Sequence, residues 1–361
     1  MNVLLTGGGT GGHVTPLIAI AAELRKKYPR IRIGFVGRQG GAENDAIKRT
    51  GIPIYTLNVT GFERKITKNS LKSIKNALAA QREARNILKQ FDANLVIGTG
   101  GYVCWPTLSA AKALSVPTVL HESNSVAGMA VKILASKADL LLIGQKRVEG
   151  LGGGLFVGNP ISAEFGSYTK SFARASLGIP KNYKLIISAG GSGGANTFNT
   201  TVPLAVKRLI DKNDSIRYVF ASGRKYYDGA KERFCDFPPS RFKILPYIND
   251  MPKMLAAADL AIVRAGAMTL AELAASRCPA IIIPSPNVTR DHQRKNAIIF
   301  EKAKAATVID EAELDEEQLS REIESVLLDD KKLLSMGRAM DALAVRDSAL
   351  RAVNLIAERF L

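Results

Sequence analysis

The sequence lacks the features of membrane-spanning, secreted and metal-binding proteins. No apolar run reaches the roughly 18–20 residues that a bilayer span requires. We expect no signal peptide, because the opening "MNVLL" leads directly into a glycine-rich turn. Three widely spaced cysteines, Cys104, Cys235 and Cys278, form no metal-binding pattern and are typical of reduced thiols in a cytoplasmic protein.

Positive charge is in excess, and most of it lies in the first half of the chain. The formal net charge is +17 over 361 residues, and residues 1–160 contribute 21 Lys and Arg against 9 Asp and Glu. A nucleic acid, an anionic lipid or a phosphorylated substrate would explain this asymmetry. A generally basic proteome explains the total but not the distribution. A nucleic-acid-binding module is disfavoured, because no basic–aromatic recognition motif accompanies the charge.

The densest part of this charge falls in the segment 62–90. It holds eight Lys and Arg against two Glu, and Leu71, Ile74 and Leu78 recur among them at helical spacing. Such a cationic amphipathic helix can lie on an anionic membrane surface. The alternative is an ordinary helix whose apolar face covers a sheet.

The remaining pattern predicts two doubly wound α/β domains in tandem. Short apolar runs such as "IRIGFVG" and "NLVIGTG" alternate with helical patterns, which is typical of parallel strands covered by helices. The pattern restarts after a link at about 157–167. "LLTGGGTGGH" and "LIISAGGSGGAN" are each a strand, a glycine turn and a helix start, about 180 residues apart. We therefore expect Rossmann-like domains over 1–162 and 163–340, facing a cleft.

The first glycine turn, "GGGTGGH" at 7–13, matches the GxGxxG dinucleotide fingerprint. Glycines let the backbone approach a phosphate beside a helix N-terminus, and we expect that helix over 16–28 with Thr15 as its cap. The Gly-Lys-Ser/Thr ending of a P-loop is missing, which argues against ordinary ATP hydrolysis. Arg38 stands where NAD-binding folds carry an acid. An NADP oxidoreductase therefore stays open, but an NAD enzyme is disfavoured.

Three groups of residues in the first half are candidates for chemistry. His13 follows the glycines and is a candidate general base, or it only hydrogen-bonds the loop. Tyr102 lies in a third glycine turn, where it contacts a ligand or closes the turn. The polar run His121–Asn124 ends a strand, at the sheet edge where open α/β proteins bind ligands.

The second half adds two candidate helix starts. "RAGAMTLAE" follows a strand, and Thr269 and Glu272 have the spacing of a capping box, which we favour over a ligand site on spacing alone. His292, Gln293 and Asn296 share one helix face. Amides and an imidazole there would suit hydroxyl-rich sugars, whereas the alternative is an ordinary exposed polar face.

Taken in order, the motifs resemble those of a known family. In chain order they are "GGTGGHVTP", "IGTGGYV", "LHESN", "GNP", "GGSGGA", "VRAGAMTLAE" and "HQRKNA". This ordered set resembles the motifs of the MurG family, the UDP-N-acetylglucosamine transferases of peptidoglycan synthesis, which have the GT-B fold. The resemblance runs nearly end to end. It implies inverting transfer of GlcNAc from UDP-GlcNAc to the MurNAc 4-hydroxyl of lipid I (undecaprenyl-diphospho-MurNAc-pentapeptide), which forms lipid II.

The resemblance also implies how the work is divided. The N-terminal domain, with 341–361 returning to it, takes lipid I at the cytoplasmic face of the cell membrane, and the C-terminal domain holds UDP-GlcNAc. It implies no metal, no cofactor and no nucleic acid, but contacts with an anionic membrane surface and with cell-wall synthesis proteins. Catalytic candidates are His13, Glu122 and Tyr102. The substrate-binding residues implied are Thr10, Gly11, Gly12 and Asn124 at the donor sugar, Ser192 at the phosphates, Ile248, Ala267, Met268, Thr269, Leu270 and Ala271 around uracil and ribose, Glu272 at the ribose hydroxyls and Gln293 at the GlcNAc hydroxyls.

Three positions depart from the family pattern. Ser162 stands where an arginine commonly follows "GNP", Gly193 removes a side chain from the second glycine turn, and Trp105 replaces a residue that is often small. The alternative function is that of a related GT-B enzyme that glycosylates a diacylglycerol.

Overall fold

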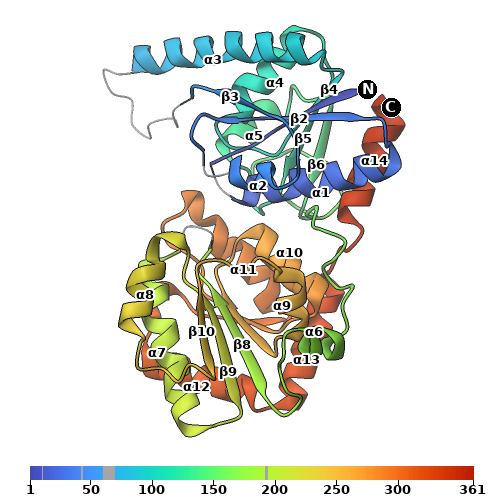
Figure 1. Cartoon of the computed structure of the whole chain (residues 1–361). Coiled ribbons are helices and arrows are strands. Elements are labelled where there is room, and N and C mark those ends of the chain that lie inside the picture. The colour runs from blue at the N-terminus through green and yellow to red at the C-terminus, as the bar shows by residue number, and fades with distance from the viewer. Residues whose placement is uncertain (10, 42–43, 60–69, 192–193) are drawn as a thin grey trace. The chain divides into compact units, whose positions relative to one another are not determined.

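The chain forms two units, each built on one parallel sheet with helices on both faces (Figure 1). The computed structural model describes residues 1–9, 11–41, 44–59, 70–191 and 194–361, without the side chains of 70–77. The first unit is Met1–Ser162 with Asp347–Leu361, and the second is Ala163–Arg346. We expected the return to the first unit at 341–361. It begins at Asp347 instead, because helix α13 (Asp330–Leu343) packs on the second unit's α10 (Ala267–Ser276).

The first sheet has the strand order β3-β2-β1-β4-β5-β6-β7, all parallel. The chain winds outward from β1 to β3 and then crosses back to β4, so the winding direction reverses between β1 and β4. Thr6 at the end of β1 pairs with Val36 and Gly98 on either side. The strands are β1 (Asn2–Thr6), β2 (Arg32–Arg38), β3 (Ile54–Leu57), β4 (Leu95–Gly98), β5 (Thr118–Glu122), β6 (Leu140–Ile143) and β7 (Leu155–Phe156).

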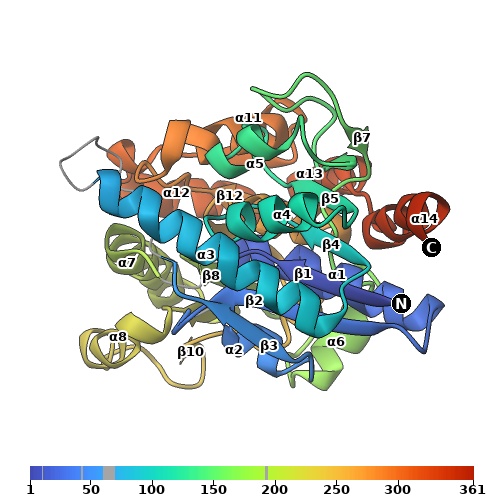
Figure 2. The ribbon, with the colours of Figure 1, turned by 90° about the horizontal axis from the view of Figure 1, so that it is seen from above.

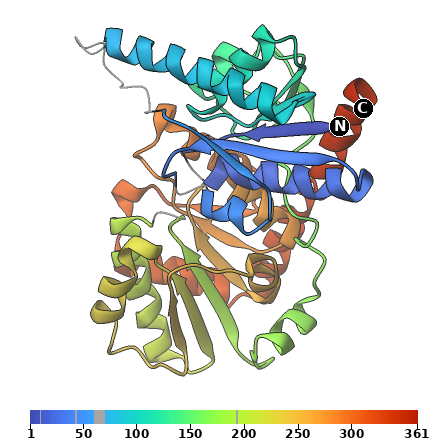
Figure 3. The same cartoon turned by 45° about the horizontal axis from the view of Figure 1, so that its top comes forward.

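Alternating side chains send the first sheet's apolar residues to both faces. Val3 and Leu5 join the core under α1 and α14, whereas Leu4 faces α3 and α4. Figure 2 shows α3 and α4 lying across the strands, and Figure 3 shows α14 beside α1. The helices are α1 (Gly11–Lys27), α2 (Asn44–Lys48), α3 (Ser70–Phe91), α4 (Cys104–Ala113), α5 (Met129–Leu134) and α14 (Ser348–Phe360).

The start of α1 differs from the expected one. We expected a helix over 16–28 with Thr15 as its cap, but α1 begins at Gly11. The Thr15 hydroxyl donates to the carbonyl of Gly11 at 3.0 Å, a bond made inside a helix and not at its cap. Low helix propensity makes glycine look like a breaker in sequence. Here Gly11 and Gly12, at the end of the glycine turn, form the first turn of α1, so the amides at the start of the helix lie in the glycine turn.

The second sheet repeats this topology with the order β10-β9-β8-β11-β12-β13. Its strands are β8 (Lys184–Ala189), β9 (Ile216–Ala221), β10 (Phe242–Leu245), β11 (Leu260–Val263), β12 (Ala280–Ile282) and β13 (Ala306–Val308). Its α-helices are α6 (Lys170–Ser176), α7 (Asn196–Lys212), α8 (Tyr227–Arg233), α9 (Met251–Ala257), α10, α11 (His292–Lys302), α12 (Glu316–Leu327) and α13, with short 3₁₀ turns η1 (Arg224–Tyr226), η2 (Thr289–Asp291) and η3 (Glu311–Glu313).

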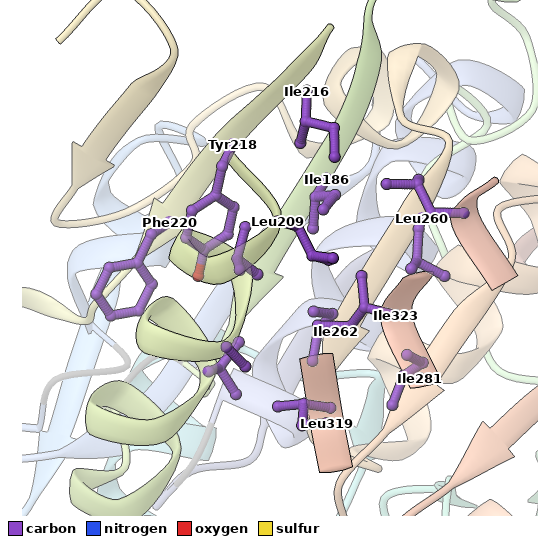
Figure 4. Close-up of a cluster of buried hydrophobic side chains, with 14 of the residues drawn as sticks. Ile186, Leu209, Ile216, Tyr218, Phe220, Leu260, Ile262, Ile281, Leu319 and Ile323 are labelled. Atoms are coloured by element: carbon purple, nitrogen blue, oxygen red, sulfur yellow. The ribbon is translucent and has the colours of Figure 1, made fainter. Parts of the chain in front are cut away.

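One core holds the second sheet to its helices. Figure 4 shows Tyr218 and Ile186, from β9 and β8, pointing toward Leu209 of α7 and Ile323 of α12. The buried Tyr218 hydroxyl lies 2.5 Å from the Ser188 hydroxyl, which satisfies both polar groups. This packing fixes the strands whose carboxyl ends carry the second set of candidate loops.

In the described ranges, no helix combines the length and apolar character that a membrane span requires.

Candidate functional site

The candidate motifs gather where each sheet reverses its winding direction. In the first unit the loops after β1 and β4 flank this switch point, and in the second unit the loops after β8 and β11 do so. The crevice at such a point is the usual ligand site of open α/β sheets, because neighbouring loops diverge to opposite faces there. The sequence pattern places glycine-rich or small-residue turns after all four of these strands.

The two glycine turns of the first unit are packed against each other so closely that side chains are excluded. A Cβ on Gly101 would lie 2.1 Å from the carbonyl oxygen of Gly8, and Gly101 has a φ of +81°. A Cβ on Gly7 would lie 2.5 Å from the Thr99 hydroxyl. That hydroxyl donates to the carbonyl of His13 at 2.5 Å. Backbone from both turns is therefore brought together at the switch point.

His13 lies in the first turn of α1, with its ring held by the loop before it. Its Nδ1 is 3.2 Å from the carbonyl oxygen of Gly8. A carbonyl can only accept, so Nδ1 carries the proton and Nε2 keeps its lone pair. The Nε2 atom would lie 3.6 Å from a Cβ on Gly100, so glycine leaves room beside it. This arrangement suits a general base.

Tyr102 closes the third glycine turn against the first. Its ring edge would lie 3.1 Å from a Cβ on Gly9, which has a φ of +90°. The ring is partly buried against the core under α3 and α4. This contact agrees with the packing alternative for Tyr102.

Glu122 and Asn124 form a hydrogen-bonded loop after β5. One carboxylate oxygen of Glu122 accepts from the amide and the side-chain nitrogen of Asn124, at 2.9 and 3.0 Å, and the other accepts from the amide of Gly128 at 2.8 Å. Beside it, His121 is fully buried and bonds the carbonyl of Gly158 at 3.0 Å, and burial lowers its pKa to about 4. The "HESN" motif thus builds the loop more than it presents free polar groups.

In the second unit, α10 begins differently from the expected capping box. Gly266 is the N-cap and no side chain caps the helix, so the interpretation of Thr269 and Glu272 as a capping box is wrong. Met268 and Leu270 are buried in the core. Glycine at the cap lets a ligand approach the start of the helix closely, where an anionic or hydroxyl-bearing group is favoured.

Glu272 is the most perturbed acid of this site. Its carboxyl group is half-buried, and burial raises its pKa from 4.5 to about 8. Within the described residues no cation or donor offsets this cost. A carboxyl group that is desolvated without a protein partner is a candidate ligand-binding group.

Gln293 connects two strand ends. Its side-chain oxygen accepts from the amides of Ala265 at 3.2 Å and Ser285 at 2.9 Å, in the loops after β11 and β12. The oxygen is therefore committed to the fold, and the side-chain NH₂ group is the part that remains for a ligand. Ile248 follows β10 and is only 3% exposed, so its backbone is what it can offer.

The structure brings the predicted residues together at the two switch points in most cases, and two of them lie outside its described part. Thr10 and Ser192 fall outside the described residues, as does Gly193. Gly11, Gly12 and His13 form the start of α1, and Ala267 to Ala271 form the start of α10. Trp105 lies in the first turn of α4, partly buried in the core.

Sequence reasoning missed two supporting residues. Thr99 links the turns after β1 and β4 through its bond to His13. Arg264, directly after β11, donates to the carbonyls of Ile283 and Pro284 at 3.1 and 3.2 Å and pairs with Glu311. An arginine directly after an apolar strand was the available signal, but its partners are far away in sequence.

Family models match both units. Residues 3–143 match the glycosyltransferase family 28 N-terminal domain, and residues 185–352 match the glycosyltransferase family 28 C-terminal domain.

Full-length relatives carry the same description. The chain is 38% identical over 361 residues to the UDP-N-acetylglucosamine--N-acetylmuramyl-(pentapeptide) pyrophosphoryl-undecaprenol N-acetylglucosamine transferase of Acetivibrio thermocellus, covering 99% of this chain and 97% of the relative. The crystal structure of Acinetobacter baumannii MurG has a TM-score of 0.76 at 26% identity, with 99% of each chain covered. The expected fold of two Rossmann-like domains is confirmed.

The fold by itself does not decide the reaction. A putative UDP-N-acetylglucosamine 2-epimerase from Listeria monocytogenes is also similar, with a TM-score of 0.73 at 12% identity, covering 100% of this chain and 96% of that one. At that identity only the fold is shared. The full-length sequence relationship and the residues at the switch points must therefore carry the assignment.

Proposed function

Because the chain belongs to the MurG family of glycosyltransferase family 28, we infer that it transfers GlcNAc from UDP-GlcNAc to lipid I and forms lipid II. The observation that carries this inference is 38% identity maintained over 99% of the chain. That span includes every glycine turn and helix start at the two switch points. A relationship limited to one unit would support only a nucleotide-binding fold.

The test is transfer of radiolabelled GlcNAc. Purified protein is incubated with labelled UDP-GlcNAc and either a lipid I analogue or diacylglycerol. We expect label in the lipid I analogue alone, and binding of UDP but not of NADPH by fluorescence. Label that entered diacylglycerol and not lipid I would contradict the proposal in favour of the related GT-B glycolipid enzymes.

We further propose that the two units divide the substrates. The first unit takes lipid I, and the amides of the packed glycine turns hold its diphosphate. Support comes from the close approach of Gly101 to Gly8 and from the start of α1 in the same turn. The basic balance of residues 1–160 favours an anionic substrate there.

In the second unit, UDP-GlcNAc lies across the starts of α10 and α11. Thr269 and Ala271 are half-buried and line the first turns of α10, and the Ile248 backbone borders the uracil. The Glu272 carboxylate accepts from the ribose hydroxyls, and the Gln293 NH₂ group donates to a GlcNAc hydroxyl. The bonds that fix the Gln293 oxygen support this orientation.

His13 acts as the general base in this proposal. Its Nε2 takes the proton of the MurNAc 4-hydroxyl while that oxygen bonds to the anomeric carbon. The bond from this carbon to UDP breaks, UDP keeps the electron pair, and the configuration inverts. Backbone amides at the helix starts stabilise the leaving diphosphate. Because both oxygens of Glu122 accept loop hydrogen bonds, Glu122 positions Asn124, and Tyr102 closes the turn.

Attachment to the cytoplasmic face of an anionic membrane is part of the proposal. Leu78 on α3, and Met129 and Ile133 on α5, are 50%, 60% and 44% exposed in a basic unit. Exposed apolar side chains among cations suit a membrane surface. The segment 60–69 and the side chains of 70–77 lie outside the described residues, so the amphipathic pattern there rests on sequence.

Charge reversal tests this attachment. Changing Lys68, Lys72 and Lys75 together to Glu should weaken binding to anionic vesicles by about 10-fold or more, since each basic residue contributes roughly 1 kcal/mol. The matched control reverses Lys181, Lys302 and Lys304, which are exposed in the second unit. Vesicle sedimentation that is equally weakened in both variants would place the contact elsewhere.

A further inference from the structure

Arg38 occupies an unusual position at the end of β2. Arg38 lies two residues beyond Val36, which pairs with Thr6 at the end of β1. Arg38 therefore borders the first glycine turn at the point where that turn leaves β1. On its other side Arg38 pairs with Leu57 of β3. The arginine is thus at the carboxyl edge of the sheet, one strand away from the switch point and on the opposite side of β1 from the third glycine turn.

The guanidinium of Arg38 has no partner within the described part of the chain. The side chain is half-buried and its Nε is inaccessible to solvent, yet none of the described residues gives it a hydrogen bond, ion pair or ring contact. A partly desolvated charge without a partner costs free energy. A native fold that keeps such a charge requires an explanation, and binding of an anionic ligand is one.

Two other arginines with a buried, unbonded Nε show how unusual this is. Arg217 donates through its terminal nitrogen to the carbonyl of Gly178 at 3.1 Å and lies over the ring of Tyr183. Arg264 is bonded to two carbonyls and paired with Glu311. Both charges have protein partners, whereas Arg38 has none among the residues that the structure describes.

The loop that follows β2 holds the backbone of Arg38 in place without neutralising its charge. The side-chain NH₂ group of Asn44 donates to the carbonyl of Arg38 at 2.9 Å, and the amide of Gly41 donates to the same carbonyl at 3.0 Å. Asn44 is only 8% exposed, and a Cβ on Gly37 would lie 2.5 Å from its oxygen. The backbone of Arg38 is therefore fixed, which reduces the entropy lost when the guanidinium binds.

We propose that Arg38 binds a carboxylate of the acceptor's peptide and so contributes to acceptor specificity. This inference rests on the proposed function, in which the glycine turns of the first unit hold the diphosphate. Those turns and the start of α1 already supply donors for the diphosphate. A pentapeptide brings at least one further anion, and a planar guanidinium matches a carboxylate with two parallel bonds.

The experiment compares three lipid-linked MurNAc diphosphate acceptors: one with the full pentapeptide, one whose peptide carboxylates are amidated, and one without peptide. Arg38→Met removes the charge while keeping apolar length, and Arg38→Lys keeps a charge but not the planar fork. Arg49→Met is the matched control, because Arg49 is exposed in the same unit. Initial rates give kcat and KM for each acceptor and for UDP-GlcNAc.

We expect Arg38→Met to raise the KM for the pentapeptide acceptor by roughly 10–100-fold, as loss of a charged hydrogen-bonding pair does. The KM for UDP-GlcNAc and the values for the amidated and peptide-free acceptors should change less than about threefold. Arg38→Lys should fall between the parent and Arg38→Met. The thermal midpoint of Arg38→Met should stay or rise, since an unpaired charge is removed.

A KM that rises equally with the peptide-free acceptor would assign Arg38 to the diphosphate or sugar and overturn the proposal. So would an unchanged KM for the pentapeptide acceptor, or a lower thermal midpoint with equal losses on all three acceptors. If the parent enzyme transfers GlcNAc to none of them, the proposed function fails and this inference with it. Normal transfer by the parent with a silent Arg38→Met overturns only the role of Arg38.

Discussion

Replacing His13 with alanine is expected to lower kcat about 10²–10⁴-fold, the usual contribution of a general base. The KM for UDP-GlcNAc should change less than about threefold, because the donor is assigned to the second unit. The expectation follows from the hydrogen bond between Nδ1 and the Gly8 carbonyl, which places the proton on Nδ1 and makes Nε2 the basic nitrogen of the ring. Steady-state kinetics with a lipid I analogue measures both constants.

His13→Gln separates basicity from loop support. A glutamine side chain keeps an NH₂ donor for the Gly8 carbonyl but accepts no proton at neutral pH. We therefore expect His13→Gln to lose as much kcat as His13→Ala while retaining the parent's thermal midpoint. Near-normal turnover in either variant would remove His13 from the role of base. Recovery of turnover in His13→Gln alone would make it a loop-positioning residue.

The architecture could be predicted from the sequence because it depends on local patterns. Buried parallel strands are short apolar runs, and the repeated strand, glycine turn and helix start gives one doubly wound unit twice. The switch-point location of the loops then follows from strand order. Helix starts were predicted less well. Glycines that begin α1 look like breakers, and Thr269 with Glu272 has the spacing of a cap that Gly266 provides instead.

The roles of individual polar residues depended on contacts that the sequence does not contain. Gln293 accepts from two amides whose loops meet only because β11 and β12 are neighbours. Glu122 in "HESN" looks like a candidate catalytic base, but its oxygens accept hydrogen bonds from amides up to six residues further along the chain. Sequence motifs could identify candidate site residues mainly where these residues lie in turns. Whether each one binds, positions or packs is decided by neighbours distant in sequence.

Glu272→Gln is expected to weaken UDP-GlcNAc binding and to stabilise the fold at the same time. A carboxylate that accepts two ribose hydroxyls makes charged hydrogen bonds of about 1.5–3 kcal/mol each, so a neutral amide should raise the KM for UDP-GlcNAc by roughly 10²-fold or more. The free energy of unfolding should increase in the variant, because burial penalises the ionised carboxyl group and glutamine carries no charge.

The pH dependence has a definite sign. The pKa of Glu272 is about 8 in the folded protein against an ordinary value of 4.5. Between these values the folded chain holds a proton that the unfolded chain has released, so stability falls as pH rises from about 4.5 to 8. Glutamine does not titrate. The advantage of Glu272→Gln should therefore grow across this window, toward a limit of about 4–5 kcal/mol that partial exposure reduces.

In the parent enzyme, the affinity for UDP-GlcNAc should increase over the pH range in which the stability of the fold decreases. Ribose hydroxyls stabilise the ionised carboxylate, so the KM for UDP-GlcNAc should fall as pH rises toward 8, and this dependence should be missing in Glu272→Gln. Thermal unfolding at pH 6 and pH 8.5 measures the stability difference. Glu324→Gln, a matched change at an exposed glutamate of α12, should alter neither quantity.

The two readouts of Glu272 separate a ligand-binding role from a structural one. A structural carboxyl group would lose stability and affinity together on replacement, because the loop it supports would loosen. If the carboxyl group is kept desolvated for the ribose, its replacement raises the stability of the fold and lowers the affinity for UDP-GlcNAc. The difference in stability between variant and parent then widens as the pH rises. If Glu272→Gln binds UDP-GlcNAc normally, or if its thermal advantage stays constant between pH 6 and pH 8.5, the burial that perturbs Glu272 has no part in donor recognition.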